Sequence, residues 1–498
     1  MGHGSDDRSG RRPDARRLTV SASGTAPSPA GGGPDSLAHA RKVVIGLMPV
    51  NFLYAIDQSM VPVALLSIGQ ELADLPLIAW VMAGYLVAGT IATPIYGKLS
   101  DIHGRRRMLS IAILIAFAGT LACSLAVSMP MLVGARVVQG LGSGAVFALA
   151  QAAVADFVSG PERGRFQAYF SGVFATSALV APLLGGFLTE HLSWRAIFVL
   201  NLPIALLSLW LVRKVLPERA ARAASDARID WLGAALLAAG LATVLIALTR
   251  VGQGAGWLGT STLVLLAIGS VLLALWGWRE SDAPQPIVPL TLFRNRVVLS
   301  CCLITAFNFF VLIGTTVLLP LFMQTVGAAR PDEVAVRLIA LTLAVPAGAF
   351  TAGRVMMRTR HLGRLTALGC ALSGLALIAL AWAMPKAGVG LAALMIPLGV
   401  GLGLTLPVVM VVAQMEVGPA MTGVVTATVS FFRSLGGVVG IAVLTSVVLA
   451  AAKGGAITAA DPAALREAFG FAFAMAGCVS LLGAALAIRL PSLIPKGR

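Results

Sequence analysis

Gly97-Lys-Leu-Ser-Asp-Ile-His-Gly-Arg-Arg-Arg-Met-Leu109 separates two apolar runs that are each long enough to cross a bilayer. Its two glycines and five charged residues do not continue a membrane helix, so the stretch is predicted to form a turn. Asp101 is able to cap a helix start, where its charge favours the positive end of the helix dipole. Three consecutive arginines are typical of a cytoplasmic loop. The stretch therefore predicts a cytoplasmic turn between two membrane spans.

The whole chain has the composition of a membrane protein. Of its 498 residues, 58% are apolar and only 12% are charged, which excludes a soluble globular protein. The net charge of +16 does not indicate nucleic-acid binding, because the basic residues are scattered through short gaps between apolar runs. The five cysteines lie within apolar runs without metal-ligand spacing, so we expect small apolar core residues and no metal site.

Fourteen apolar runs are long enough to span a bilayer, which predicts an all-α protein with fourteen transmembrane helices. Lysine and arginine are roughly four times as frequent in the connecting segments on one side as on the other. This asymmetry predicts that both termini lie in the cytoplasm. The runs are Val43–Leu66, Leu77–Tyr96, Met108–Val127, Met131–Ala153, Phe166–Leu188, Ala196–Val212, Trp231–Leu248, Thr260–Trp278, Val297–Leu319, Val334–Gly353, Leu365–Met384, Gly390–Val412, Thr422–Leu449 and Phe469–Leu490.

The spans divide into six, two and six. The N-terminal segment is rich in Gly, Ser, Pro, Ala and Arg, lacks a short apolar core with a cleavage site, and is predicted to be a disordered cytoplasmic tail and no signal peptide. The predicted regions are this tail (1–40), an N-terminal six-helix bundle (43–213), a basic loop with two additional helices and a cytoplasmic linker (214–296), a C-terminal six-helix bundle (297–490) and a cytoplasmic tail (491–498).

An acidic residue lies inside the first span. Asp57 falls with Asn51, Tyr54 and Gln58 within about 120° of the helix surface, which predicts a polar stripe along one wall of an aqueous cavity. A carboxyl group at that depth either faces a cavity or has a charged partner. It can hold a proton or face a cation, and this competition is the minimum needed for proton-for-cation exchange. The alternative is a structural partner for a buried basic group.

Arg136 in the fourth span is the candidate partner of Asp57. The two residues lie about 8 Å and about 13 Å below the outer ends of their helices, close enough for contact if those helices are neighbours. A structural or snorkelling arginine is the alternative. Gly140 and Gly144, four residues apart, predict close helix packing. Proline and glycine in the fifth span predict a kinked packing face, formed by Pro182, Gly185 and Gly186.

The remaining polar groups inside spans are weaker candidates. Single amides in helices line cavities about as often as they form interhelical hydrogen bonds. The amides considered as cavity residues are Gln139, Asn308, Gln324 and Gln414. Arg433, a second embedded cation, is interpreted as mainly structural, because no acidic residue lies deep in the second half. The chain has no phosphate-binding glycine loop, so we expect neither an enzyme nor a cofactor, and transport energy would come from an ion gradient, a substrate gradient or a partner.

Several of these segments resemble motifs of the major facilitator superfamily, and in particular of its fourteen-helix drug:proton antiporters. Gly97–Leu109 is similar to the loop between helices 2 and 3, and Arg136–Gly144 to the helix 4 motif Arg-x-x-Gln-Gly-x-Gly. The fifth span resembles the antiporter motif, with Ser177 and Ala181 where the family has glycines. Further matches are Asp57, Trp80, Tyr85, Thr93-Pro94, Ser193–Phe198, Asn201–Pro203, Phe432-Arg433 and Gly436-Gly437.

The resemblance, which covers about residues 43 to 490, implies two six-helix bundles with two extra central helices, and alternating access by rocking of the bundles. It implies that the first, fourth, ninth and twelfth spans line the cavity and that Arg136 is linked to proton movement. It also implies that Asp101 meets the start of the thirteenth helix near Met421 and latches the outward-facing state. The predicted latch comprises Gly97, Asp101, Gly104, Arg105 and Arg106.

The functional hypothesis is multidrug efflux across the inner, cytoplasmic membrane, with antibiotic resistance as its outcome. The substrate would be an amphipathic cationic drug or toxic organic compound exchanged for protons, with Asp57 as the proton and cation site and Arg136 as its modulator. The expected partners are a small-molecule substrate, protons and the lipid bilayer, with no nucleic acid, and the protein is expected to be a monomer. The alternatives are export of a specific neutral or anionic natural product or metabolite, an uptake symporter, or a non-transporting membrane sensor.

Overall fold

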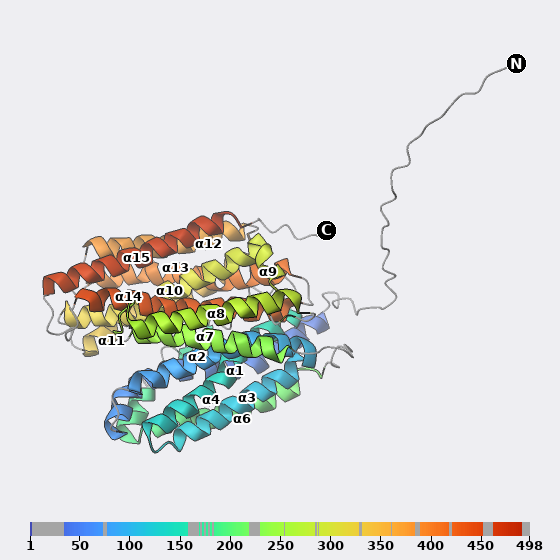
Figure 1. Cartoon of the computed structure of the whole chain (residues 1–498), viewed down its shortest axis with the longest axis horizontal. Coiled ribbons are helices and arrows are strands. Elements are labelled where there is room, and N and C mark those ends of the chain that lie inside the picture. Colours follow the sequence, from blue (N-terminus) through green and yellow to red (C-terminus); the bar gives the residue numbers. More distant parts are fainter. Residues whose placement is uncertain are drawn as a thin grey trace.

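Most of the chain between residue 34 and residue 490 is described by a computed structural model (Figure 1). The predicted Pro182 and the tail 491–498 lie outside the described residues. The described residues are Met1, 34–72, 77–157, 169, 172–173, 176–177, 180–181, 184–218, 230–252, 254–283, 286, 288–327, 331–359, 361–383, 389–417, 421–451 and 462–490.

Every secondary-structure element in the described part of the chain is a helix. In the first half they are α1 (Pro34–Glu71), α2 (Ile78–His103), α3 (Arg105–Ser124), α4 (Met129–Phe157) and α6 (Arg195–Val215). Two further helices follow, α7 (Trp231–Gly252) and α8 (Thr260–Asp282). The second half contains α9 (Thr291–Arg294), α10 (Arg296–Thr325), α11 (Pro331–Met356), α12 (Leu362–Ala383), α13 (Val389–Glu416), α14 (Thr422–Ala451) and α15 (Pro462–Ile488).

Among the described residues, 12 helices are long and apolar enough to cross a membrane. They are α1, α3, α4, α6, α7, α8 and α10 to α15. Of the other two predicted spans, Leu77–Tyr96 lies almost entirely within α2, and Phe166–Leu188 is described only in part. The chain is therefore an all-helical multi-pass membrane protein, and the total of fourteen spans stays a prediction.

Two helix boundaries differ from the expectations. The stretch from Gly97 to His103 was predicted to leave the helix, but α2 continues through it, and only Gly104, with φ 88°, separates α2 from α3. Charged side chains do not prevent backbone hydrogen bonding once the helix has left the bilayer, so the turn shrinks to the one residue that needs a positive φ. The second difference is at the start of α1, which begins at Pro34, within the predicted tail. Proline is favourable in the first turn of a helix.

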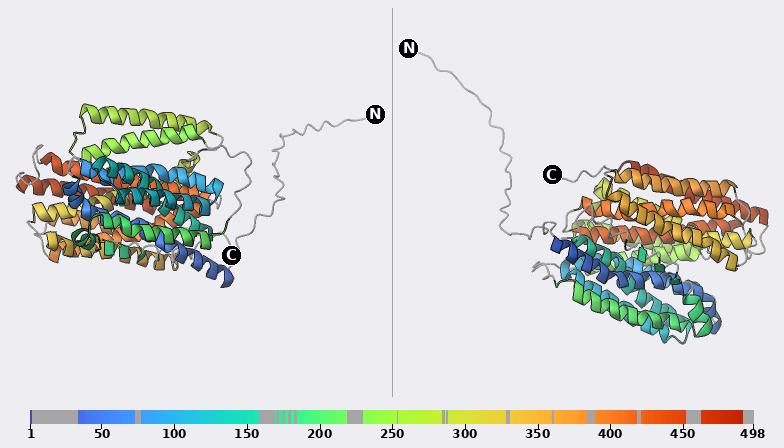
Figure 2. Two further views of the ribbon diagram at one scale, coloured as in Figure 1. Left: turned by 90° about the horizontal axis from the view of Figure 1, so that it is seen from below. Right: turned by 180° about the vertical axis from the view of Figure 1, so that it is seen from behind.

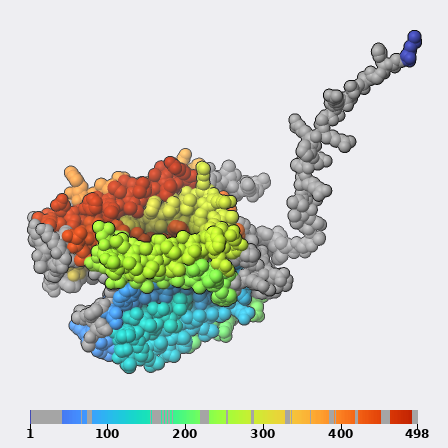
Figure 3. Space-filling view, viewed as in Figure 1, coloured from blue at the N-terminus to red at the C-terminus, as the bar shows by residue number. Residues whose placement is uncertain are grey.

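The helices form two bundles, and α7 and α8 lie side by side along the boundary between them (Figures 1 and 2). In Figure 1 the first bundle, α1 to α6, is at the bottom and the second, α9 to α15, is at the top. Separate clusters of buried apolar side chains fill the two bundles. Figures 2 and 3 show α7 and α8 on one outer face, where they cover the boundary between the bundles. Val87 of α2, Leu245 of α7 and Val438 of α14 share one apolar cluster there.

Glycines on α4 bring three helices of the first bundle into backbone contact. A Cβ atom on Gly140 would collide with the backbone of Tyr85, and one on Gly144 with the backbone of Gly89, both on α2. Gly142, on the opposite side of α4, faces α3 in the same way. Gly185 is looser, with its nearest neighbour, the Met60 carbonyl, at 3.2 Å. Because α4 lies so close to both neighbours, its polar residues are held at fixed distances from theirs.

The end of α1 is tied to the start of α6 at the end of the first bundle opposite Gly104. Glu71 accepts a hydrogen bond from Trp194 Nε1 at 2.7 Å and a charged one from Arg195. The bond from Arg195 lowers the pKa of Glu71, because the guanidinium stabilises the ionised carboxylate. These bonds join the end of α1 to the start of α6.

Candidate functional site

Asp57 is the centre of a buried polar network in the first bundle. Its Oδ2 lies 2.9 Å from Arg136 Nη1, and the two side chains are 3% and 0% exposed. Its Oδ1 accepts hydrogen bonds from Gln139 Nε2 at 3.0 Å and from Asn201 Nδ2 at 3.4 Å. The structure therefore brings together the two charged residues that their depths suggested, on α1 and α4, and adds two amides around the carboxylate.

Arg136 is held on every side. Its Nε donates to the carbonyl of Val81 at 3.1 Å, and its Nη1 donates to Gln139 Oε1 at 2.6 Å as well as to Asp57. Its guanidinium carbon lies 4.0 Å from the centre of the Tyr85 ring. A buried ion pair is tolerated only when further hydrogen bonds satisfy both partners, and this network meets that condition. The pair is neutral as a whole, so it presents no net charge to the bundle boundary.

Gln139 and Asn201 connect the pair to the neighbouring helices. Gln139 Nε2 also donates to Thr120 Oγ1 of α3 at 2.9 Å, so with the Val81 carbonyl of α2 the network draws on five helices of one bundle. From the sequence, Asn201 was predicted only as part of a family motif and not as a site residue. What could have indicated its role is that it is the single amide within the apolar run Ala196–Val212. Its Oδ1 is buried without a hydrogen-bond partner among the described residues, as is Oδ1 of Asn51.

A second polar contact crosses between the bundles one turn away from Asp57. The hydroxyl of Tyr54 accepts hydrogen bonds from Gln58 Nε2 at 3.3 Å and from Arg433 Nη2 at 3.1 Å. Arg433 belongs to α14 of the second bundle, and its guanidinium lies 4.0 Å from the centre of the Phe147 ring on α4. Arg433 was interpreted from the sequence as mainly structural, and the structure places it at the boundary between the bundles.

The remaining cavity candidates separate into two groups. Asn308 Nδ2 donates to the carbonyl of Leu402 at 3.3 Å, and Gln414 Nε2 donates to Thr426 Oγ1 at 3.0 Å. Both are buried and join helices of the second bundle, which is the interhelical alternative considered for single amides. Gln324, by contrast, is exposed near the end of α10. No group of three or more His, Cys, Asp or Glu that could hold a metal occurs among the described residues.

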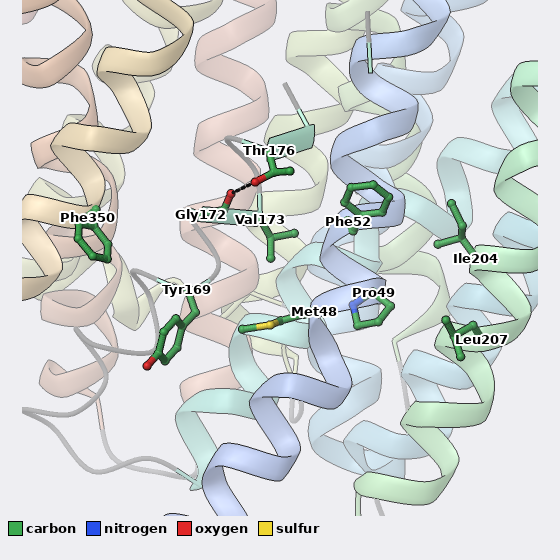
Figure 4. A pocket seen from close by; sticks show the side chains of 10 residues that line it. All are labelled: Met48, Pro49, Phe52, Tyr169, Gly172, Val173, Thr176, Ile204, Leu207 and Phe350. Atoms are coloured by element: carbon green, nitrogen blue, oxygen red, sulfur yellow. Dashed lines mark hydrogen bonds between the residues drawn. The ribbon is translucent and has the colours of Figure 1, made fainter. Parts of the chain in front are cut away.

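An apolar hollow of about 650 Å³ lies beside the first bundle (Figure 4). It is bounded by α1, α6, a described part of the fifth predicted span and Phe350 of α11. None of the predicted cavity residues lines it. Its lining residues are Met48, Pro49, Phe52, Tyr169, Gly172, Val173, Thr176, Ile204, Leu207 and Phe350.

The predicted latch lies where α2 meets the start of α14. Asp101 pairs with Arg105 at 2.8 Å and accepts a hydrogen bond from the backbone N–H of Val424. Arg105 also pairs with Asp156 of α4 at 3.1 Å. Burial raises the pKa of Asp101, which lies beyond the end of the predicted span, and Arg105 offsets that effect only in part.

The other latch candidates have different neighbours. Gly97 packs so closely on α14 that a Cβ atom there would collide with Ala427. Arg106 Nη1 lies 3.9 Å from Glu218 Oε2. Gly104 provides the positive φ between α2 and α3. The structure therefore joins Gly97, Asp101 and Arg105 to the second bundle and leaves Arg106 outside that contact.

Comparisons with known proteins agree with this architecture. The family model of the Major Facilitator Superfamily matches residues 47–441. An MFS-type transporter of the acurin A biosynthesis cluster from Aspergillus aculeatus is 35% identical over 333 residues, 65% of this chain and 60% of that protein. The multidrug transporter protein MdtP of Bacillus subtilis is 27% identical over 410 residues, 81% of this chain and 74% of that protein. The matched regions span 57% to 60% of the length of the fungal relatives, which include the efflux pump FUS6 of Gibberella moniliformis.

Solved structures support the same fold. The proton:xylose symporter XylE aligns with a TM-score of 0.64 over 92% of this chain and 97% of its own, at 16% sequence identity. The human organic anion transporter MFSD10 aligns with a TM-score of 0.62 over 91% of this chain and 100% of its own, at 17% identity. At such identities the likeness shows the fold alone. With a family model that matches most of its length, this chain belongs to the Major Facilitator Superfamily of membrane transporters, and efflux pumps and multidrug transporters are among its relatives.

Proposed function

We propose that this chain exports amphipathic organic compounds in exchange for protons, with Asp57 as the proton-carrying group and Arg136 as its modulator. The observation that carries the proposal is the burial of the Asp57–Arg136 pair within the first bundle. Ionisable residues inside membrane spans are expensive to bury and typically mark ion or substrate pathways. The multidrug transporter and efflux pump relatives support export as the direction of transport.

Protonation of Asp57 would change the charge balance of the whole network. A neutral Asp57 no longer compensates the charge of Arg136, which keeps uncharged partners such as the Val81 carbonyl, Gln139 and the face of the Tyr85 ring. A buried charge without a counter-ion is unfavourable by several kcal/mol in order of magnitude. The proton therefore favours a different arrangement of the helices that hold Asp57, which is how a proton gradient would drive a conformational change.

Two contacts between the bundles are placed to respond to that change. Tyr54 precedes Asp57 by one turn of α1 and contacts Arg433 of the second bundle. Asp101 and Arg105 join α2 to the start of α14. We propose that the second contact closes one end of the transport path in the arrangement described, and that it opens when the bundles rock.

The substrate class depends on which charges remain available. The sequence favoured a cationic compound because Asp57 was the only deep acid. In the folded chain, Arg136 already neutralises Asp57. Arg433 at the bundle boundary has no ion-pair partner among the described residues, so the alternative of a neutral or anionic compound fits the geometry better. The protein would act in the cytoplasmic membrane as a monomer with both termini inside.

An efflux assay with a carboxylate variant tests the proposal. Cells that lack their own drug exporters would express the wild type, Asp57→Asn or Asp282→Asn, with folded protein quantified for each. Asp282 is an exposed carboxylate at the end of α8 and serves as the matched control. Efflux of cationic, neutral and anionic dyes would be followed with and without an uncoupler.

We expect uncoupler-sensitive efflux from the wild type and the Asp282 variant, and none from Asp57→Asn. Equal efflux from Asp57→Asn would remove the carboxylate from the mechanism. In proteoliposomes, acid on the outer side should drive substrate outward. Inward movement would indicate an uptake symporter, and the absence of any flux would indicate a non-transporting sensor.

A further inference from the structure

We propose that Arg433, together with the rings of Tyr54, Phe147 and Phe309, forms a recognition site for an anionic group, so that the transported compound carries a carboxylate or sulfonate beside an aromatic or apolar body. This inference rests on the proposed function and names its substrate class. The site lies at the boundary between the bundles, on side chains from α1, α4, α10 and α14.

The guanidinium of Arg433 has donors to spare. It lies within the membrane-spanning part of α14, roughly 16 Å from the start of that helix. One hydrogen bond, to the neutral Tyr54 hydroxyl, is made within the described part of the chain, and no described carboxylate lies within ion-pair distance. A guanidinium carries five N–H donors in a planar fork that matches a carboxylate or sulfonate. The side chain is only partly buried, so a ligand can reach it.

Three aromatic rings surround this cation. The centres of the Phe147, Phe309 and Tyr54 rings lie 4.0, 5.4 and 5.6 Å from the guanidinium carbon. Cation–π attraction stabilises the charge while no anion is bound. The same rings offer an apolar surface to the body of a ligand whose anionic group faces Arg433. Because the rings come from both bundles, the site changes shape whenever the bundles move.

The charge distribution selects against cations at this position. The neighbouring acid, Asp57, has its charge compensated by Arg136 and is almost fully buried. A cation that entered between the bundles would meet Arg433, and no described carboxylate within ion-pair distance of Arg433 would offset the repulsion. An anion would replace the weak bond from Arg433 to the Tyr54 hydroxyl with a charge-assisted one. Arg433 thus favours anions, and its contact with Tyr54 is the one that the ligand displaces.

Matched probes test the charge preference directly. Pyrenebutyrate, pyrenebutanol and pyrenebutyltrimethylammonium share a ring and chain and differ in charge. Binding to the full chain in phosphatidylcholine nanodiscs would be followed by energy transfer from tryptophan to pyrene, with empty nanodiscs subtracted and no pH gradient. We expect the wild type to bind the carboxylate roughly 10- to 100-fold more tightly than the ammonium probe, as a charge-assisted hydrogen bond provides. Equal or reversed affinities would overturn the proposal without any variant.

Variants assign the preference to the residue. Arg433→Gln should weaken pyrenebutyrate binding by roughly 10- to 100-fold and leave the ammonium probe unchanged or bound more tightly. Arg354→Gln is the control, because Arg354 also lies 4.0 Å from a phenyl ring, that of Phe350, but is exposed near the end of α11. If both variants lose affinity alike, or neither does, Arg433 is not the recognition group. Should Arg433→Gln unfold, Arg433→Lys takes its place, because lysine keeps the charge without the planar fork of donors. Arg433→Lys should show a smaller loss of affinity for pyrenebutyrate and no loss of affinity for the ammonium probe.

The two proposals fail separately. Equilibrium binding needs no proton coupling, so Asp57→Asn should keep the preference for pyrenebutyrate while it loses coupled efflux. Coupled efflux without an anion preference would support the proposed exporter and contradict the anion site at Arg433. An anion preference without coupled efflux would support the anion site and contradict the proposed proton-coupled export.

Discussion

Replacing Gly97 with alanine should weaken the contact between the bundles at the start of α14. The added methyl group would face the methyl of Ala427 across the boundary. It would lie more than ~1 Å inside the ~3.5–4.0 Å optimum for two carbon atoms. Neither methyl group can rotate away, so α2 and α14 have to separate. Overpacking of this kind costs about 1–3 kcal/mol, which corresponds to roughly a 5- to 150-fold loss in the population of the closed contact.

Hydrogen–deuterium exchange measures that loss at the contact itself. Backbone amides at the start of α14, where Val424 donates to Asp101, should exchange faster in Gly97→Ala, because the arrangement that protects them is populated less. The control is Gly134→Ala on α4, where a Cβ atom meets nothing within 4 Å. Both variants gain the same helix propensity, of about 1 kcal/mol, so their difference reports the collision alone.

The result that would refute the reasoning is equal exchange at the start of α14 in the two variants. Faster exchange throughout the first bundle of Gly97→Ala would also refute it, because general loosening does not depend on the contact between α2 and α14. A local increase combined with slower transport would support a latch role for this contact.

Three further predictions follow from the same geometry. Asp57→Asn and Arg136→Gln should each destabilise the protein by on the order of 3 kcal/mol, while the double variant loses clearly less than their sum, since it leaves no buried charge; additive losses in thermal unfolding would contradict this. Gly144→Ala should lower the free energy of unfolding by about 1–3 kcal/mol, because the added methyl group collides with the Gly89 backbone. The control Gly134→Ala, also on α4, should cause no such loss in the same assay. Glu71→Gln should lower stability by less than ~1 kcal/mol at neutral pH, because the carboxylate is half exposed. Its folded pKa is lowered, so that difference should vanish as the pH falls below 4.5 and through the folded value; a difference independent of pH would contradict it.

Much of the fold follows from local properties of the sequence. Long apolar runs have to be helices in a bilayer, because no other segment satisfies its own backbone there. The same reasoning misjudged the stretch from Gly97 to His103, since charge decides where a helix leaves the membrane and not where it ends. The helix α2 ends just before Gly104, which adopts a positive φ. A glycine at this position was the feature of the sequence that indicated where the helix ends.

The candidate site was predictable to the extent that charges need partners. Asp57 and Arg136 are the two deep charges of the first half, so their similar depths were enough to suggest a contact, which the structure contains. The roles assigned to them stay predictions. Asn201 was missed as a site residue because one amide in an apolar run has no pattern that distinguishes a ligand of Asp57 from an ordinary interhelical bond.

The position of Arg433 could not be inferred from spacing. Its partner Tyr54 lies 379 residues away in the other bundle, and no periodicity relates the rotation of one bundle to that of the other. Without a nearby acid, the residue looked structural. The position of one bundle relative to the other depends on contacts between folded surfaces, such as that of Gly97 with Ala427. Such contacts cannot be inferred from the spacing of residues in the sequence.

The placement of α7 and α8 makes the two flanks of the protein unequal toward the lipid. On one flank the pair packs along α2 and α14 and shields the seam from acyl chains (Figure 3). On the other flank, the apolar hollow between α1 and Phe350 is not covered by α7 and α8 (Figure 2). The extra helices therefore give an otherwise two-fold architecture a front and a back (Figure 2).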